Sequence, residues 1–268
     1  MKATIGIINT RNYILKVFLT CVIASFLLWV IYHLLRHLEL GAPAECYFMA
    51  QVCVVLLIAT YLAAYSIHTG FFRARFNASV ASSTAHLLTL SPISTGRWLL
   101  RQLLLSQVPV LCWIFISTGV ALFITDLRFT ATLEILTILA IYGLASGAVG
   151  MLCGQVFRDT LFGTECATLL WCVLIAGALL LNPLQRYVDD PQPFIPLVLH
   201  LNPLIAVNGI FEGLDIFRKP VLYELTPVTS YNYQYPNPWY LVGVWHLVIG
   251  GCCFLGAWWT CRPRIYNI

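Results

Sequence analysis

The segment FRARFNASVASSTAHLLTLSPISTGRWLLRQL, from Phe72 to Leu103, separates two long apolar stretches and decides how the rest of the chain is arranged. It contains four arginines and no acidic residue. Four of its side chains recur at the spacing of one helix face, which predicts a short amphipathic helix: Val80, Thr84, Leu87 and Leu88. Pro92 is expected to end this helix, because the residue before a proline is pushed out of the α region. Ser94 is expected to cap the next helix. A basic amphipathic helix between two apolar stretches is suited to contact a cytoplasmic partner.

Composition indicates a polytopic membrane protein. Of the 268 residues, 60% are hydrophobic and 10% are charged, whereas soluble domains carry about 25% charged residues. The sequence shows no internal repeat, low-complexity segment or flexible linker. We therefore expect residues 1–268 to form a single transmembrane domain. Residues 1–13 are too polar for the core of a cleavable signal peptide, so the first span is expected to act as an uncleaved anchor. These residues would form either an interfacial helix or a frayed end.

Six apolar stretches, each near the ~20 residues that a bilayer requires, predict an all-α protein with six transmembrane helices. We place the spans at Ile14–Leu35, Phe48–Thr69, Leu103–Thr125, Ile135–Val156, Phe162–Leu181 and Trp239–Cys261. The fourth and fifth spans are separated by a very short turn around Arg158 and Asp159. These two spans should therefore be antiparallel neighbours.

The distribution of charge predicts that both termini lie in the cytoplasm. With the amino terminus inside, the inner segments hold ten of the 15 Lys and Arg residues and two of the 11 acidic residues. The outer segments then hold the other five basic residues and nine acidic residues. Because an excess of Lys and Arg marks cytoplasmic segments, the segment from Phe72 to Leu103 is expected to be cytoplasmic.

The only long loop expected on the outer side runs from Asn182 to Pro238. Two of its pieces, Phe194–Leu204 and Ile205–Phe217, are apolar but too short to cross a bilayer. Asn202 and Pro203 separate them. This pattern predicts a re-entrant or interfacial helix pair before the last span. The remainder, Leu225–Pro238, contains three tyrosines and would either anchor the loop at the membrane surface or cap the mouth of a pathway.

The ten cysteines predict neither a disulfide framework nor a metal site. Eight of them lie in the apolar stretches, where cysteine acts as a small hydrophobic residue. No C-x-x-C pair occurs, so the sequence does not support a zinc or redox centre.

This plan of spans and loops resembles that of the type 2 ABC-exporter permeases, and two segments carry the resemblance. Thr84–Ser94, TAHLLTLSPIS, is similar to the family segment TLELLLSTPIS. His200–Leu204, HLNPL, is similar to the family segment xLNPL before the last span. The chain departs from the family at Ser82 and Ser83, where an acidic residue and a glycine are common. The resemblance thus implies a less charged contact with the ATPase.

In that family the short helix after the second span is the coupling helix, which docks in a cleft of the ATPase subunit. The resemblance assigns this role to Ser79–Leu90. The residues that would make or support the contact are Thr84, His86, Leu87, Leu88, Leu90, Ser91, Pro92 and Arg97. No P-loop motif G-x-x-x-x-G-K-[ST] occurs in the chain. ATP and Mg are therefore expected on a separate ATPase subunit, with no cofactor bound by this chain.

The resemblance also implies further partners and a location. A single six-span bundle would need a second permease copy or a paralogue, and an accessory periplasmic or membrane protein could join them. The lipid bilayer is the other expected partner, and nucleic acid is not expected. The chain would be a multi-pass protein of the bacterial inner membrane.

Polar side chains inside the spans are the candidates for a transport pathway, since such residues are costly in a bilayer. Tyr61, Tyr65 and His68 share one face of the second span, and His246 lies in the sixth. His68 would alternatively reach the membrane interface, and His246 would alternatively form a hydrogen bond with a neighbouring carbonyl.

Small residues in the fourth span predict close helix packing. Two G-x-x-x-G pairs leave a groove along this span, and they comprise Gly143, Gly147, Gly150 and Gly154. Packing within one subunit is favoured over a dimer seam, because small-residue faces are common inside helical bundles.

The main functional hypothesis is the membrane subunit of an ABC exporter that moves a hydrophobic or amphipathic cargo by alternating access. Two alternatives remain. The chain could be a membrane enzyme that acts on lipid through the outer acidic residues Asp189, Asp190, Glu212 and Asp215. It could also be a scaffold that anchors a partner complex without transporting anything.

Overall fold

The computed structural model describes residues 2–78, 92–125, 128–184, 187–188, 192–211, 216–223, 225–226 and 233–266. This part of the chain is helical, with no β-strand within it. Its long helices are α1 (Lys2–His37), α2 (Pro43–Ala78), α4 (Pro92–Ile124), α5 (Phe129–Phe157), α6 (Thr160–Ile175) and α11 (Tyr240–Tyr266). The short ones are α7 (Gly177–Leu184), α8 (Phe194–Leu201), α9 (Ile205–Ile210), the 3-10 turn η1 (Ile216–Arg218) and α10 (Pro220–Tyr223).

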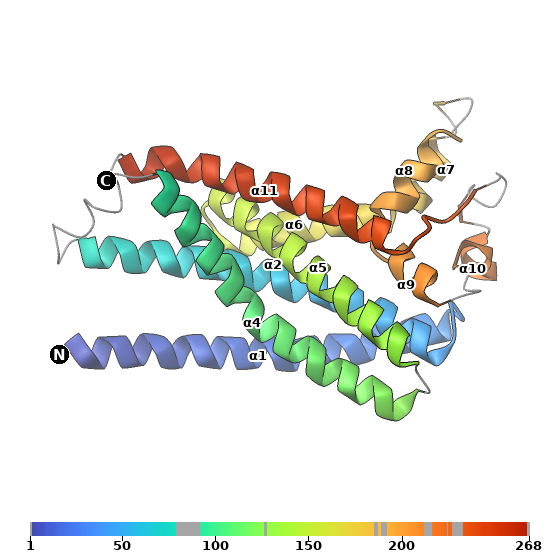
Figure 1. Ribbon diagram of the computed structural model, residues 1–268, viewed down its shortest axis with the longest axis horizontal. Coiled ribbons are helices and arrows are strands. Elements are labelled where there is room, and N and C mark those ends of the chain that lie inside the picture. The colour runs from blue at the N-terminus through green and yellow to red at the C-terminus, as the bar shows by residue number, and fades with distance from the viewer. Residues whose placement is uncertain are drawn as a thin grey trace.

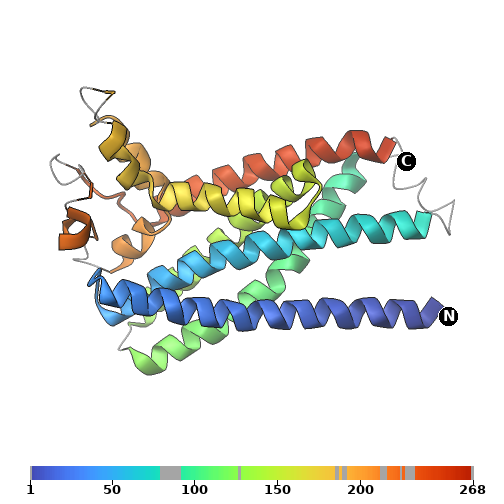
Figure 2. The same ribbon diagram turned by 180° about the vertical axis from the view of Figure 1, so that it is seen from behind.

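The long helices lie along one another in an elongated bundle, and the short helices gather at one end of it (Figures 1 and 2). Helix α5 is central and packs against α2, α4, α6 and α11. In the apolar part of α2, 78% of the residues are buried, whereas in α1 only 11% are. Helices α2 and α5 therefore form the core, and α1 lies at the periphery.

Length and hydropathy identify five helices in the described chain that are able to cross a membrane: α1, α2, α4, α5 and α11. A sixth crossing requires α6 and α7 together, and these two helices meet at an angle of 68°. The all-α, multi-pass character expected from the sequence is thus confirmed. The expected fifth span, Phe162–Leu181, is thus divided by a bend and forms either a broken span or a re-entrant segment.

The fifth span breaks at Ala176, between α6 and α7. At the break, the Asn202 side chain donates a hydrogen bond of 2.9 Å to the carbonyl of Ile175. That carbonyl would bond to the amide of Leu179 if the helix continued, but the Leu179 amide bonds to Ala176 instead, at 2.8 Å. The side chain of Asn202, which is distant in sequence, thus stabilises a bend that the local sequence does not predict.

The short turn between the fourth and fifth spans has the expected form. Arg158 ends α5 in the left-handed conformation, with φ of 57°. Asp159 caps α6, and its carboxylate accepts a hydrogen bond of 2.8 Å from the amide of Phe162. Because two residues reverse the chain, α5 and α6 pack against each other, as predicted.

Two helix starts differ from the expectations. Helix α1 begins at Lys2 and runs without a break to His37, so residues 2–13 extend the helix of the first apolar stretch. Helix α4 begins at Pro92, so the prediction that Ser94 is its N-cap is wrong. Proline is well suited to the first turn of a helix, where its missing N–H would have no intrahelical partner.

The long loop contains the short helices α8 and α9, which pack against different parts of the bundle. Helix α8 ends at Leu201, directly before Asn202 and Pro203, as expected. It packs against α7, α6 and α11, whereas α9 packs against α2, α5 and α11. Two short helices are thus present in this loop, and the end of the fifth span, α7, supplies a packing partner for α8.

Both chain ends lie at the end of the bundle opposite the short helices (Figure 1). The C-terminal end of α2 and the N-terminal end of α4 lie at that same end. The predicted coupling segment therefore leaves and rejoins the bundle on the side of the two termini.

Candidate functional site

His246 on α11 is the most deeply buried ionisable side chain among the predicted site residues, with no exposed surface. Its Nδ1 lies 2.7 Å from the carbonyl oxygen of Val242, one turn earlier in the same helix. Because a carbonyl can only accept, Nδ1 carries the proton and donates it. The other ring nitrogen, Nε2, forms no hydrogen bond of good geometry, and the backbone of Leu201 lies near the imidazole. His246 thus lies beside the end of α8, and its bond to Val242 fixes the orientation of the imidazole.

Two aromatic rings enclose the imidazole. The ring of Tyr142 on α5 lies 4.8 Å from it, edge to face, and the indole of Trp171 on α6 lies 5.8 Å away and nearly parallel. The Tyr142 hydroxyl donates a hydrogen bond of 2.8 Å to the carbonyl of Pro203. The imidazole is therefore held between two helices, and one of them is tied to the break between α8 and α9.

Hydroxyl groups extend this arrangement into α2. The indole N–H of Trp171 donates to Thr60 Oγ1 at 3.3 Å, and the Thr60 hydroxyl donates to the Leu56 carbonyl at 2.6 Å. Ser146 Oγ donates to the Tyr142 carbonyl at 2.6 Å. We call His246, Tyr142, Trp171, Thr60 and Ser146 the His246 cluster. It connects α2, α5, α6 and α11 in the core of the bundle.

The HLNPL segment fixes the geometry beside this cluster. The Asn202 side chain donates to Ile175 at the end of α6 and accepts a hydrogen bond of 3.0 Å from the Leu204 amide. Pro203 supplies the carbonyl that the Tyr142 hydroxyl bonds. The motif therefore ends α8 and joins that end to α5 and α6.

The predicted pathway residues of α2 lie on a different face. Tyr61, Tyr65 and His68 are all half-buried. The rings of Tyr61 and Tyr65 stack with their centroids 6.2 Å apart, and the Lys16 ammonium of α1 lies 4.5 Å from the Tyr65 ring centroid. This tyrosine pair therefore packs towards α1, whereas the rings around His246 come from α5 and α6.

The four glycines of α5 are all packed within the chain. Gly143 and Gly147 face the Gln107 side chain of α4, and Gly154 faces Ala64 of α2. A Cβ atom at Gly150 would collide with the backbone of Thr60. The glycine row thus allows α2 and α4 to approach the central helix closely.

The predicted contact with an ATPase falls largely outside the described residues. This is the case for Thr84, His86, Leu87, Leu88, Leu90 and Ser91. Pro92 is the first residue of α4, and the Arg97 side chain is exposed one turn further on. The outer acidic residues of the alternative hypothesis, Asp189, Asp190, Glu212 and Asp215, also lie outside the described part of the chain.

Sequence reasoning missed most of the His246 cluster and a second polar contact between α2 and α4. In that contact, the buried Gln51 amide donates to Ser117 Oγ at 2.7 Å and to Thr118 Oγ1 at 3.0 Å. The spacing of Tyr142 and Ser146, four residues apart on one helix face, was the available signal. This spacing indicated that Tyr142 and Ser146 share a helix face, but it did not indicate that His246 lies next to that face.

The chemistry available here is hydrogen bonding and aromatic packing. Among the described residues, no group of three or more His, Cys, Asp or Glu side chains is placed to hold a metal ion. The fold and this site define a multi-pass helical membrane protein with a polar centre.

Comparison with known proteins does not assign the chain to a family. No protein-family model, curated protein or solved structure matches the chain.

Proposed function

We propose that this chain is the membrane-spanning subunit of an ATP-driven exporter and works with a separate ATPase subunit in the bacterial inner membrane. The observation that supports the proposal is the position of the helix ends that flank the segment 79–91. The helices on either side of it, α2 and α4, reach the same end of the bundle as both chain termini (Figure 1). A partner at that end would contact the segment and the chain ends together.

The distribution of Lys and Arg residues supports a cytoplasmic position for that end of the bundle. The segments assigned to that end carry ten of the 15 Lys and Arg residues, and such an excess is typical of cytoplasmic segments. The bent pair α6–α7 and the short helices α8 and α9 come before the last helix. This is the order expected of a type 2 exporter permease.

The proposed mechanism runs through α2 and α4. ATP binding would bring two ATPase subunits together, and their movement would press on the segment 79–91. Helices α2 and α4 would transmit this movement, because both pack against the central helix α5. With a second permease copy or a paralogue, the bundle would then alternate between inward-open and outward-open states.

The cargo in this proposal is hydrophobic or amphipathic. The inner faces of the helices are mainly apolar, and the polar groups that they do bury, such as Gln51 and His246, are uncharged amides, hydroxyls and an imidazole. A charged cargo would lose its hydration there without gaining an ionic partner.

Copurification tests the proposal. The solubilised protein is purified from its native membrane as wild type and with Leu87→Arg and Leu88→Arg together, and the copurifying proteins are identified by mass spectrometry. We expect a P-loop ATPase with the wild type and its loss from the double variant, because two charges would disrupt an apolar docking face.

The matched control adds the same charges to the other side of the predicted helix, with Ser82→Arg and Thr89→Arg. This control should retain the ATPase. The absence of an ATPase from the wild-type sample, or equal loss from both double variants, would contradict the proposed docking face.

A further inference from the structure

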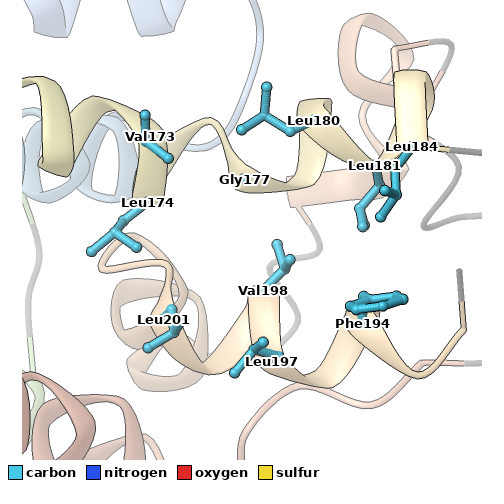
Figure 3. Close-up of a pocket in the computed structure, with 10 residues that line it drawn as sticks. All are labelled: Val173, Leu174, Gly177, Leu180, Leu181, Leu184, Phe194, Leu197, Val198 and Leu201. Atoms are coloured by element: carbon cyan, nitrogen blue, oxygen red, sulfur yellow. The ribbon is translucent and has the colours of Figure 1, made fainter. Parts of the chain in front are cut away.

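A cleft of about 310 Å³ lies between the bent pair α6–α7 and helix α8 (Figure 3). All the side chains that line it are apolar. Val173, Leu180 and Leu181 line one side, and Phe194, Leu197 and Val198 line the other. Ligand clefts commonly begin at about 300 Å³, so this space is large enough for part of a small molecule.

The bend at Ala176 creates the cleft. It turns α7 away from the axis of α6 by 68°, so that α7 and α8 project from the end of the bundle (Figures 1 and 2). The two walls meet at Gly177, where a Cβ atom would lie 3.2 Å from Val198 Cγ1. Asn202 fixes the same end through its bond to Ile175. The cleft is thus narrow near Gly177, where its two walls meet, and it is open away from that point.

The open side of the cleft continues the apolar surface of the membrane-spanning helices. Leu180 and Leu197, one from each wall, are 51% and 53% exposed. On α6, Leu169 and Val173 are also exposed, and they lead from the outer face of the bundle to the cleft. A surface of this kind is in contact with lipid when the protein is in a bilayer.

We propose that the cleft binds one acyl chain of a bilayer phospholipid. Its lining offers neither charge nor a polar side chain, so a hydrocarbon chain is the occupant that matches it. Because the cleft is continuous with the lipid-facing surface, an acyl chain reaches it without crossing water. The bound chain separates α7 from α8 and supports the bend. This inference is independent of the proposed ATPase partner.

Photo-crosslinking tests the site. The purified protein is reconstituted into phosphatidylcholine vesicles that contain a small fraction of a phosphatidylcholine with a photoreactive diazirine in one acyl chain. After illumination, labelled peptides are mapped by mass spectrometry. We expect labelling of α6–α7 and α8 to exceed that of α1, although α1 exposes more apolar surface to bulk lipid.

Two substitutions distinguish an acyl chain bound in the cleft from ordinary contact between exposed side chains and lipid. Leu197→Trp fills the cleft, whereas Leu169→Trp makes the same change at an exposed position of α6 outside the cleft lining. Each methylene excluded from an apolar site weakens binding by about fourfold. We therefore expect Leu197→Trp to reduce the labelling of α7 and α8 at least about fourfold, and Leu169→Trp to leave it unchanged.

Two results would overturn the proposal. The first is labelling that follows exposed apolar surface, with α1 labelled most strongly. The second is enriched labelling of α7 and α8 that persists in Leu197→Trp. If that variant does not purify as a folded protein, Leu180→Trp fills the cleft from the opposite wall and is judged by the same criteria.

Discussion

At the scale of single residues, polar atoms decide how this apolar chain packs. His246, Tyr142 and Thr60 form hydrogen bonds that water cannot replace in the interior. Each of these bonds joins a helix to itself or to a neighbour. The buried amides of Gln51 and Gln107 retain one unbonded oxygen each. Such groups are costly in a membrane interior, so the bonds that are made contribute to the specific arrangement of the helices.

The first prediction concerns Tyr142. Tyr142→Phe removes the bond to the Pro203 carbonyl and should destabilise the protein by about 1–3 kcal/mol, because a buried acceptor is left unpaired. Tyr187→Phe, at a residue with 86% of its surface exposed, should change stability by less than about 0.5 kcal/mol. Thermal unfolding in detergent measures both. Equal stability of the two variants would show that the hydroxyl does not hold the break between α8 and α9.

The second prediction concerns Gly150. In Gly150→Ala, the new Cβ atom meets the Thr60 backbone, so α5 and α2 must move apart, at a cost of about 1–3 kcal/mol. Gly251→Ala is the matched control, since nothing lies within 4 Å of a Cβ atom there. The same unfolding assay compares them. A Gly150→Ala protein as stable as Gly251→Ala would contradict the close packing of α2 on α5.

At the scale of elements, the bend between α6 and α7 is the feature that most shapes the molecule. It ends a span early, and it allows α8 to pack against α7. The bend depends on Asn202, which lies 27 positions from its partner Ile175. A contact of this range directs the local conformation, although the residues at the break are ordinary helix formers apart from Gly177.

The third prediction follows from that contact. Asn202→Ala removes both side-chain bonds, whereas Asn202→Asp keeps an acceptor for the Leu204 amide and loses the donor to Ile175. We expect amide hydrogen exchange at the end of α6 and in α8 to become faster in both variants, and α8 to be affected more by Asn202→Ala. Unchanged exchange at the end of α6 would contradict the role of Asn202 in the bend.

The sequence predicted those elements whose cause is local. Apolar runs located the long helices, and the two-residue connection at Arg158 and Asp159 predicted antiparallel packing of α5 and α6. The end of α8 followed from Pro203, which restricts the residue before it.

The site was harder to predict than the fold because its residues come from four helices. His246 was recognised as a polar residue in a span, but its neighbours Tyr142 and Trp171 are separated from it by at least 75 positions. No local pattern joins them. The stacking of Tyr61 and Tyr65 followed from their spacing of four residues, whereas the approach of Lys16 did not.

At the scale of the whole molecule, the bundle has one end with both termini and another end with the short helices (Figure 2). The fourth prediction is that these ends face opposite sides of the membrane. Alkaline phosphatase, active only outside the cytoplasm, should be active when inserted after Tyr187 and inactive when fused after Ile268. Activity at both positions, or at Ile268 alone, would contradict the orientation predicted from charge.

Within this arrangement, the segment 79–91 is the proposed point of contact with an ATPase. The most direct test of that claim is photo-crosslinking in native membranes, with a photoreactive amino acid in place of Leu88 and, as the control, in place of Ser82. The nucleotide-binding proteins are marked beforehand with a radioactive photoreactive ATP. The account predicts a nucleotide-labelled adduct from position 88 that is much weaker from position 82. The absence of a nucleotide-labelled adduct at either position, with the protein inserted normally, would contradict it.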